Sequence, residues 1–140
     1  MGMIFDSCIW VALAANQIDR QAVIEAARDA PVFTSVISLG ELSFGVHSCT
    51  DPAERARRAA YLRQVESRPA LGVSQHTASA FWRARRSGQA GRSVTPAALQ
   101  RPVDCRTAIE HGYTLLTLNS REFEGLPGLR LVTLSPIAQG

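Results

Sequence analysis

The chain has 140 residues, of which 46% are apolar and 19% charged, and this fits one globular domain spanning residues 1–140. No apolar run approaches the roughly 20 residues of a membrane helix, and the N-terminus lacks the basic-then-apolar pattern of a signal peptide, so we expect a cytoplasmic protein with no membrane partner. All fifteen basic residues are arginine, which excludes a catalytic lysine, and a net charge of +3 with an isoelectric point near 9.1 is compatible with a polyanionic partner.

The first predicted element is a short strand that ends on a carboxylate. Residues 3–5 are apolar, Asp6 follows them, and apolar residues at helical spacing begin at Ile9. Ser7 is available as the N-cap of that helix. Asp6 therefore lies at the carboxyl edge of a strand, where open α/β sheets bind ligands. A turn or capping role for Asp6 is the alternative at this point.

The next elements alternate between helix and strand. Helix formers cover residues 21–30, and the β-branched and aromatic residues 32–34 predict a second strand. Ser38 lies three residues before Glu41, which is the spacing of a capping box. We therefore expect a helix over residues 39–46 that carries Glu41 near its start.

The middle of the chain is less regular. Asp51 followed by proline is typical of a helix N-terminus, and Pro69 closes the helix that follows it. Residues 71–73 fit a short strand, and residues 74–85 fit a helix. Glycine and proline break the pattern over residues 87–102, where we expect a loop with one helical turn.

The C-terminal third becomes regular again. Residues 107–111 favour a helix, with Gly112 at its C′ position. Residues 113–117 predict a buried strand, residues 119–123 a short helical turn, and residues 129–133 the last strand. Strands that alternate with helices predict an α/β fold with a short, mainly parallel sheet and helices on both faces.

Four carboxylates stand next to these elements at points that a parallel sheet brings to one edge: Asp6, Glu41, Asp104 and Glu122. Carboxylates so close together repel one another unless a hard divalent cation lies among them. Mg²⁺ or Mn²⁺ held by acids suits hydrolysis of a phosphodiester, because the metal activates water and stabilises the leaving oxygen.

Other chemistries of a strand-end aspartate lack their partners. A phosphatase with an Asp-x-Asp pair would need an acid where Cys8 stands, and a phospho-accepting receiver domain would need a lysine. No Gly-rich phosphate loop of the Walker or Rossmann kind occurs. The three histidines have no partner spacing for a hydrolase and the three cysteines lack metal-type spacing, so we expect surface or packing roles for both sets.

The chain resembles the PIN-domain ribonucleases, in particular the VapC toxins of bacterial VapBC toxin–antitoxin modules. The resemblance covers nearly the whole length and depends on the order and spacing of several motifs. These motifs are residues 4–10, 38–46, 107–112, 115–119, 122–123 and 126–129.

The resemblance implies a PIN-like three-layer fold and a divalent-metal-dependent endoribonuclease that uses Mg²⁺ (or Mn²⁺). It also implies the toxin role in a type II toxin–antitoxin system, a homodimer, a cognate VapB-like antitoxin, and structured RNA of the tRNA or rRNA class as substrate. Asp6 and Glu41 match the first two family acids, and Glu122 falls where the family has Asp before Phe. Asn119 and Ser7 are accessory polar candidates.

The third family acid has no direct counterpart. Eleven residues before Gly112, where the family has Asp, this chain has Arg101, and the nearest acid is Asp104. A helix that lacks three residues would start about 4.5 Å away and be turned by about 300°. Asp104 is therefore either the third metal ligand or only a helix N-cap. If it is a cap, the alternative function is a catalytically impaired module that binds antitoxin or RNA without efficient cleavage.

The densest basic run comprises Arg83, Arg85, Arg86 and Arg92. A solvated helix face is the ordinary explanation of such a run. The alternative is a patch that follows RNA phosphates beside the acidic pocket without reading sequence.

Overall fold

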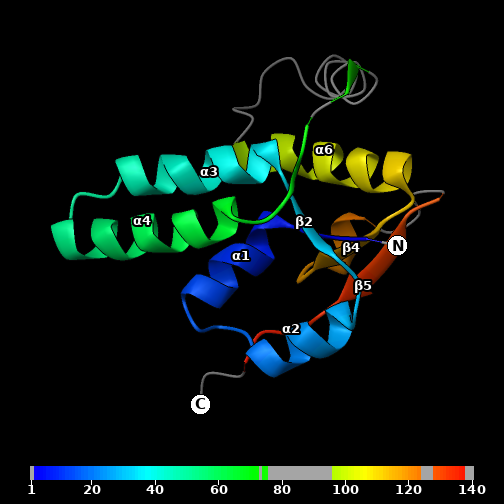
Figure 1. Ribbon diagram of the computed structural model, residues 1–140, viewed down its shortest axis with the longest axis horizontal. Coiled ribbons are helices and arrows are strands. Elements are labelled where there is room, and N and C mark those ends of the chain that lie inside the picture. The colour runs from blue at the N-terminus through cyan, green and yellow to red at the C-terminus, as the bar shows by residue number, and fades with distance from the viewer. Residues whose placement is uncertain (1, 73, 76–95, 124–127, 138–140) are drawn as a thin grey trace.

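Five short strands form one sheet in the computed structural model (Figure 1), which describes residues 2–72, 74–75, 96–123 and 128–137 and, for residues 96–103 and 122, the backbone alone. Their order across the sheet is β3-β2-β1-β4-β5, and every neighbouring pair is parallel. The predicted α/β fold is therefore confirmed, and its sheet is wholly parallel over the described residues. The strands are β1 (Met3–Phe5), β2 (Val32–Ser35), β3 (Ala70–Leu71), β4 (Thr114–Thr117) and β5 (Arg130–Thr133).

The helices connect these strands and mostly agree with the predicted ranges. Asp51 caps α4 as predicted, because its carboxylate accepts hydrogen bonds from two backbone N–H groups of the first turn. Gly112 has a φ of 65° and occupies the predicted C′ position after the last helix. The helices are α1 (Ser7–Ala14), α2 (Arg20–Ala27), α3 (Val36–His47), α4 (Pro52–Glu66), α6 (Pro96–His111) and the 3-10 turn η1 (Ser120–Glu122).

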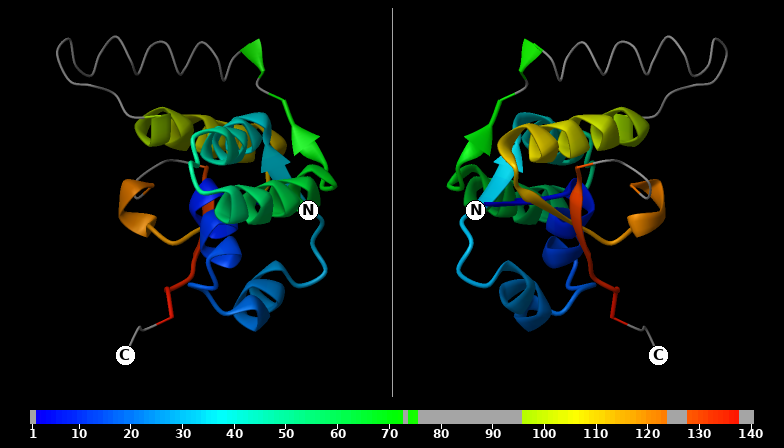
Figure 2. Two further views of the ribbon diagram at one scale, coloured as in Figure 1. Left: turned by 90° about the vertical axis from the view of Figure 1, so that its left-hand side faces the viewer. Right: turned by 90° about the vertical axis from the view of Figure 1, so that its right-hand side faces the viewer.

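Alternate residues of β1 and β4 point to opposite faces of the sheet, as strand geometry requires. Met3, Phe5 and Leu116 belong to one buried apolar cluster, and Ile4 and Leu115 belong to the other. Helices α1 and α2 cover the first face, and α6 covers the second (Figure 2). The result is three layers, with the apolar core divided between the two sides of the sheet.

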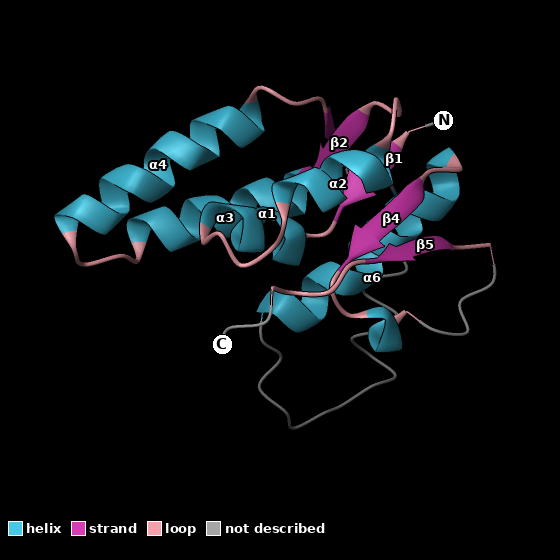
Figure 3. Ribbon diagram, turned by 90° about the horizontal axis from the view of Figure 1, so that it is seen from below, coloured by secondary structure: helices cyan, strands magenta, loops and turns pink. Residues whose placement is uncertain are grey.

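Helices α3 and α4 lie side by side and extend beyond the sheet, with α1 next to them (Figures 1 and 3). Val65, near the end of α4, is 1% exposed and belongs to the same buried cluster as the apolar residues of α1 and α2. Most other residues of α4 are half-buried or exposed. This pair of helices therefore borders the site edge of the sheet, and it contributes Val65 to the core. No helix in the described part of the chain is both long and apolar enough to cross a membrane.

Two predicted N-caps are wrong. Ser35, and not Ser38, caps α3, because its Oγ accepts the N–H of Ser38 at 3.1 Å. The helix consequently starts earlier, and Glu41 lies beyond its first turn. At α1 the N-cap position belongs to Asp6 and not to Ser7, yet the Asp6 carboxylate makes no capping bond because other side chains hold it.

The largest difference concerns α6. The predicted loop over residues 87–102 is wrong from Pro96 onward, because the helix begins there. Proline in a helix interior costs about 3 kcal/mol, so Pro102 made this stretch a poor helix by local propensity. Burial of Cys105 and Ala108 against the sheet favours the helix nonetheless. Apart from residues 74 and 75, the helix expected over residues 74–85 lies outside the described residues.

Candidate functional site

The site is at the carboxyl ends of the two central strands. Asp6 directly follows β1, and Thr117 is the last residue of β4. β2 and β3 lie on one side of β1, and β4 and β5 lie on the other. In open α/β sheets, this change of direction opens a crevice where ligands bind.

The Asp6 carboxylate is buried and held by two donors. Its Oδ2 accepts a hydrogen bond from Thr117 Oγ1 at 2.9 Å and from Cys8 Sγ at 3.1 Å. Burial and the nearby Asp6 charge raise the pKa of the Cys8 thiol to about 11, so the thiol keeps its proton at neutral pH. Only the Asp6 backbone resembles a helix cap, and the expectation that Asp6 has only a capping role fails.

Asp104 is the most unusual residue of the site. It lies in the interior of α6, its side chain is 0% exposed, and neither carboxylate oxygen has a hydrogen-bond partner among the described residues. Burial raises the pKa of Asp104 to about 8, with the Asp6 and Glu41 charges adding to the shift. The Ser35 hydroxyl opposes the shift, but its proton is engaged by Ser38 at 3.2 Å.

The charges of two predicted acids, Asp6 and Glu41, therefore act on a third, Asp104, and the three come from separate elements. Asp6 follows β1, Glu41 comes from α3, and Asp104 comes from α6. The reading of Asp104 as an N-cap is wrong, because the helix begins eight residues before it.

The remaining candidates are placed less completely. The backbone of Glu122 lies in η1 after β4, but its side chain is outside the described residues, as are Arg83, Arg85, Arg86 and Arg92. Asn119 is exposed, and its backbone N–H donates to Thr117 Oγ1 at 3.2 Å. Ser7 is the first residue of α1 and lines a groove beside the acids.

The chemistry of the donor set fits a hard divalent cation. All three acids offer carboxylate oxygens, which Mg²⁺ and Mn²⁺ prefer. A buried carboxyl without a partner is costly, and a cation beside Asp104 would supply that partner. Within the described ranges, no three His, Cys, Asp or Glu side chains already form a closed metal-binding group. The three carboxylates therefore supply oxygen ligands of the kind that a hard divalent cation prefers.

A groove of about 490 Å³ runs between α1, α3 and α4 and reaches the acids at Glu41. Val11, Ala14 and Leu42 give it an apolar lining. Arg20 at the start of α2 contributes positive charge to the same lining. The groove can therefore hold a partly apolar ligand that carries acidic groups.

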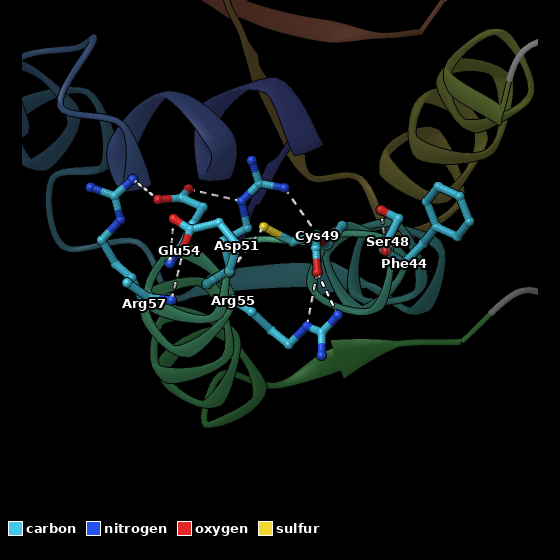
Figure 4. A network of polar contacts seen from close by, with 10 residues as sticks. Phe44, Ser48, Cys49, Asp51, Glu54, Arg55 and Arg57 are labelled. Atoms are coloured by element: carbon cyan, nitrogen blue, oxygen red, sulfur yellow. Dashed lines mark hydrogen bonds and ion pairs between the residues drawn. The ribbon is translucent and has the colours of Figure 1, made fainter.

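Arginine side chains of α4 donate hydrogen bonds to backbone carbonyls near the C-terminal end of α3 (Figure 4). Arg55 donates twice to the Cys49 carbonyl oxygen, at 2.9 and 2.6 Å, and Arg58 donates to the Gly45 carbonyl oxygen at 3.1 Å. Glu54 pairs with Arg57 and with Arg58 on the surface of α4. Both ion pairs lie within α4 and, being exposed, contribute less than about 1 kcal/mol each, so the bonds to the carbonyls, and not the ion pairs, join α4 to the end of α3.

Sequence reasoning missed Thr117, Cys8 and Ser35 as parts of the site. Each is a small polar residue next to a strand end, and each lies close to a carboxylate. The search of the sequence followed acids, histidines and metal-type cysteine spacings. A serine or threonine at the carboxyl end of a predicted strand is the signal that would have found two of these three.

The chain is similar to one family of proteins, both in a comparison with family models and in a comparison with individual proteins. The family model described as "PIN domain" matches residues 3–129. Ribonuclease VapC1 of Rickettsia felis is 27% identical over 138 residues, covering 96% of this chain and 98% of that protein.

Two solved structures show the same fold. VapBC2 of Rickettsia felis, crystallised with a DNA fragment from its promoter, superposes with a TM-score of 0.72 at 22% identity and covers 96% of this chain and 100% of that one. VapBC-5 of Mycobacterium tuberculosis superposes with a TM-score of 0.69 at 24% identity. The match covers 95% of this chain and 98% of that one.

Proposed function

Since this chain belongs to the PIN-domain family, we propose that it is a divalent-metal-dependent endoribonuclease of the VapC type, the toxin of a type II toxin–antitoxin system. The substrate class would be structured RNA such as tRNA or rRNA. The observation that supports this most strongly is the buried Asp104 carboxyl, which lacks a hydrogen-bond partner among the described residues and is influenced by the charges of Asp6 and Glu41.

Asp6, Asp104 and Glu41 would hold the cation through carboxylate oxygens. Mg²⁺ or Mn²⁺ bound there supplies an activated water and stabilises the charge on the leaving oxygen. Asp104 contributes most when ionised, and a neighbouring positive charge lowers the pKa of a carboxyl. Burial of Asp6 and Asp104 excludes bulk water and strengthens every charge interaction at the site. Glu122 and Asn119 would complete the pocket from the turn after β4.

The matching experiment measures cleavage of a structured RNA by the full chain in Mg²⁺, in Mn²⁺ and in EDTA. We expect cleavage in both metals and none in EDTA. Glu41→Gln should lower kcat/KM by roughly a hundredfold, equivalent to about 2.7 kcal/mol, because a neutral amide is a poor ligand for a hard cation. Glu25→Gln, an exposed change on α2, is the control. Cleavage that persists in EDTA or in Glu41→Gln would contradict the proposal.

A second candidate is favoured by one observation: in the described part of the chain, no three acids are drawn together into a closed metal-binding group. On this alternative, the chain is a catalytically impaired module that binds antitoxin or RNA. Calorimetric titration with Mn²⁺ separates the two, because an active nuclease should bind Mn²⁺ and the impaired module should not at millimolar concentration. A homodimer remains an expectation of the resemblance, and a cytoplasmic location remains an expectation from the sequence.

We propose that the groove between α1, α3 and α4 receives the cognate antitoxin. Its apolar lining suits side chains of a peptide better than RNA phosphates, and Arg20 would pair with an acidic residue of that peptide. Because Glu41 lines the same groove, a bound peptide would reach the acids.

Filling the groove should separate inhibition from catalysis. A Cβ at Gly45 would meet only Arg58 Nη1, at 3.8 Å, so Gly45→Phe fits the helix and places its ring in the groove. We expect antitoxin binding to weaken by about tenfold or more, with cleavage by the free toxin retained. Gly40→Phe on the same helix is the control, because its Cβ would enter open space. Equal antitoxin affinity of both variants, measured by calorimetry, would exclude this groove.

A further inference from the structure

The two donors to Asp6 are themselves oriented by the backbone of the turn after β4. The Asn119 N–H donates to Thr117 Oγ1 at 3.2 Å, and the Leu118 N–H donates to Cys8 Sγ at 3.5 Å. An N–H that occupies a lone pair of the oxygen or sulfur leaves the hydroxyl or thiol proton free to point elsewhere. Both groups donate to Oδ2 of Asp6, and Cys8 Sγ and Thr117 Oγ1 also lie 3.5 Å apart, within hydrogen-bonding distance of each other.

Both donors end on the same carboxylate oxygen. Thr117 comes from the last position of β4 and Cys8 from the first turn of α1, and neither donates to Oδ1. Thr117 is 0% exposed, so water does not compete for its hydroxyl. The two hydrogen bonds fix the rotation of the carboxylate, because one of its two oxygens is bound from two sides.

We propose that Thr117 and Cys8 are positioning residues that hold Oδ2 of Asp6 within the protein and present Oδ1 to the cation. This inference rests on the proposed function, because it assigns a role to Asp6 as a metal ligand. Neither residue touches the cation or the RNA. Their effect is transmitted through Asp6, as hydrogen-bonded partners behind metal ligands orient those ligands in other metalloenzymes.

The test measures Mn²⁺ affinity of the full chain by calorimetry together with the melting midpoint of the metal-free protein. Thr117→Val keeps the shape of the side chain and removes the donor, and we expect Mn²⁺ binding to weaken by about 10- to 100-fold. Thr117→Ser restores the hydroxyl and should bind close to wild type. Cys8→Ala should weaken binding by about tenfold, and Cys8→Ser, which keeps a donor, should restore most of it.

Matched controls exist for both changes. Thr34→Val removes another buried hydroxyl near the end of a strand, where it donates to the Ser35 carbonyl, and Cys49→Ser replaces a half-buried thiol beyond α3. Both should leave Mn²⁺ affinity unchanged. A role limited to folding would lower the melting midpoint of Thr117→Val and leave its Mn²⁺ affinity at the wild-type value.

The outcomes separate this inference from the proposed function. If the wild-type chain binds no Mn²⁺, both are overturned. If it binds Mn²⁺ and Thr117→Val and Cys8→Ala bind equally well, the positioning role is overturned and the proposed function stands. If Thr117→Val does not fold, the pair Cys8→Ala and Cys8→Ser decides the question by the same comparison.

Discussion

Asp104→Asn should abolish metal-dependent RNA cleavage, with a loss of at least about a thousandfold, equivalent to about 4 kcal/mol. Asparagine has nearly the same size as aspartate, so the packing of α6 against the sheet should survive. The change removes a buried carboxylate oxygen that a divalent cation would bind, and the neutral amide replaces it poorly. Cleavage in Mg²⁺ and Mn²⁺ affinity should fall together.

The same substitution should stabilise the metal-free protein at neutral pH. Burial and neighbouring acids raise the pKa of Asp104 from 3.8 to about 8 in the folded chain. Between these two pH values the folded state binds a proton that the unfolded state has lost, so wild-type stability contributed by this group falls as pH rises from about 4 to about 8. Asparagine does not titrate, and the Asp104→Asn variant should therefore lack this fall.

Melting midpoints in EDTA across that pH range measure the effect. Asp51→Asn is the control, because Asp51 is an exposed N-cap and asparagine caps a helix about as well as aspartate. Asp51→Asn should leave both the pH dependence of the melting midpoint and the cleavage rate as they are in the wild type. An Asp104→Asn protein that folds and keeps wild-type Mn²⁺ affinity would show that Asp104 is not a ligand.

Leu115→Ala should have the largest effect on stability, a loss of about 2–5 kcal/mol. Leu115 is 0% exposed, lies in β4 between β1 and β5, and packs in the same cluster as Cys105 and Ala108 of α6. The cavity left by the substitution would loosen α6 beneath Asp104. We therefore expect weaker Mn²⁺ binding in addition to the lower midpoint of urea unfolding.

Ile24→Ala is the comparison for this change. Ile24 is also a large aliphatic residue, but it is 61% exposed on α2, so its loss should alter the free energy of unfolding by less than about 0.5 kcal/mol. Unfolding curves in urea, monitored by circular dichroism, give both values. A Leu115→Ala protein as stable as Ile24→Ala would mean that the second cluster contributes little to the fold.

The order of strands and helices could be predicted because each short apolar run is bounded by proline, glycine or a capping residue. Asp51 and Gly112 carry such local signals, and the structure confirms both. The start of α3 could not be chosen from sequence, since Ser35 and Ser38 both precede a helical stretch at capping distance. Ser35 is the N-cap because β2 pairs with β3 as far as Ser35, so the helix begins at the next residue.

The placement of Asp104 depends on contacts that local propensity does not contain. Pro102 argues against a helix, yet Asp104 and Ala108 are one turn apart and both are fully buried. The helix was expected to be short by three residues, with Asp104 at its start. It instead extends past Asp104 toward the N-terminus, so the acid is carried by a helix interior and not by a cap. Thr117 escaped prediction for a similar reason, because its partner Asp6 lies 111 residues away.

That separation also governs when the site forms during synthesis. β1 is made first, but its pairing with β4 and the hydrogen bond from Thr117 to Asp6 must wait for residues 114–117. Pairing of segments so far apart is slow, because the intervening chain loses much entropy when its ends meet. A nascent chain that stops before β4 lacks the strand whose last residue, Thr117, holds the Asp6 carboxylate. The growing polypeptide would therefore be harmless to the RNA around it until most of its length has been translated.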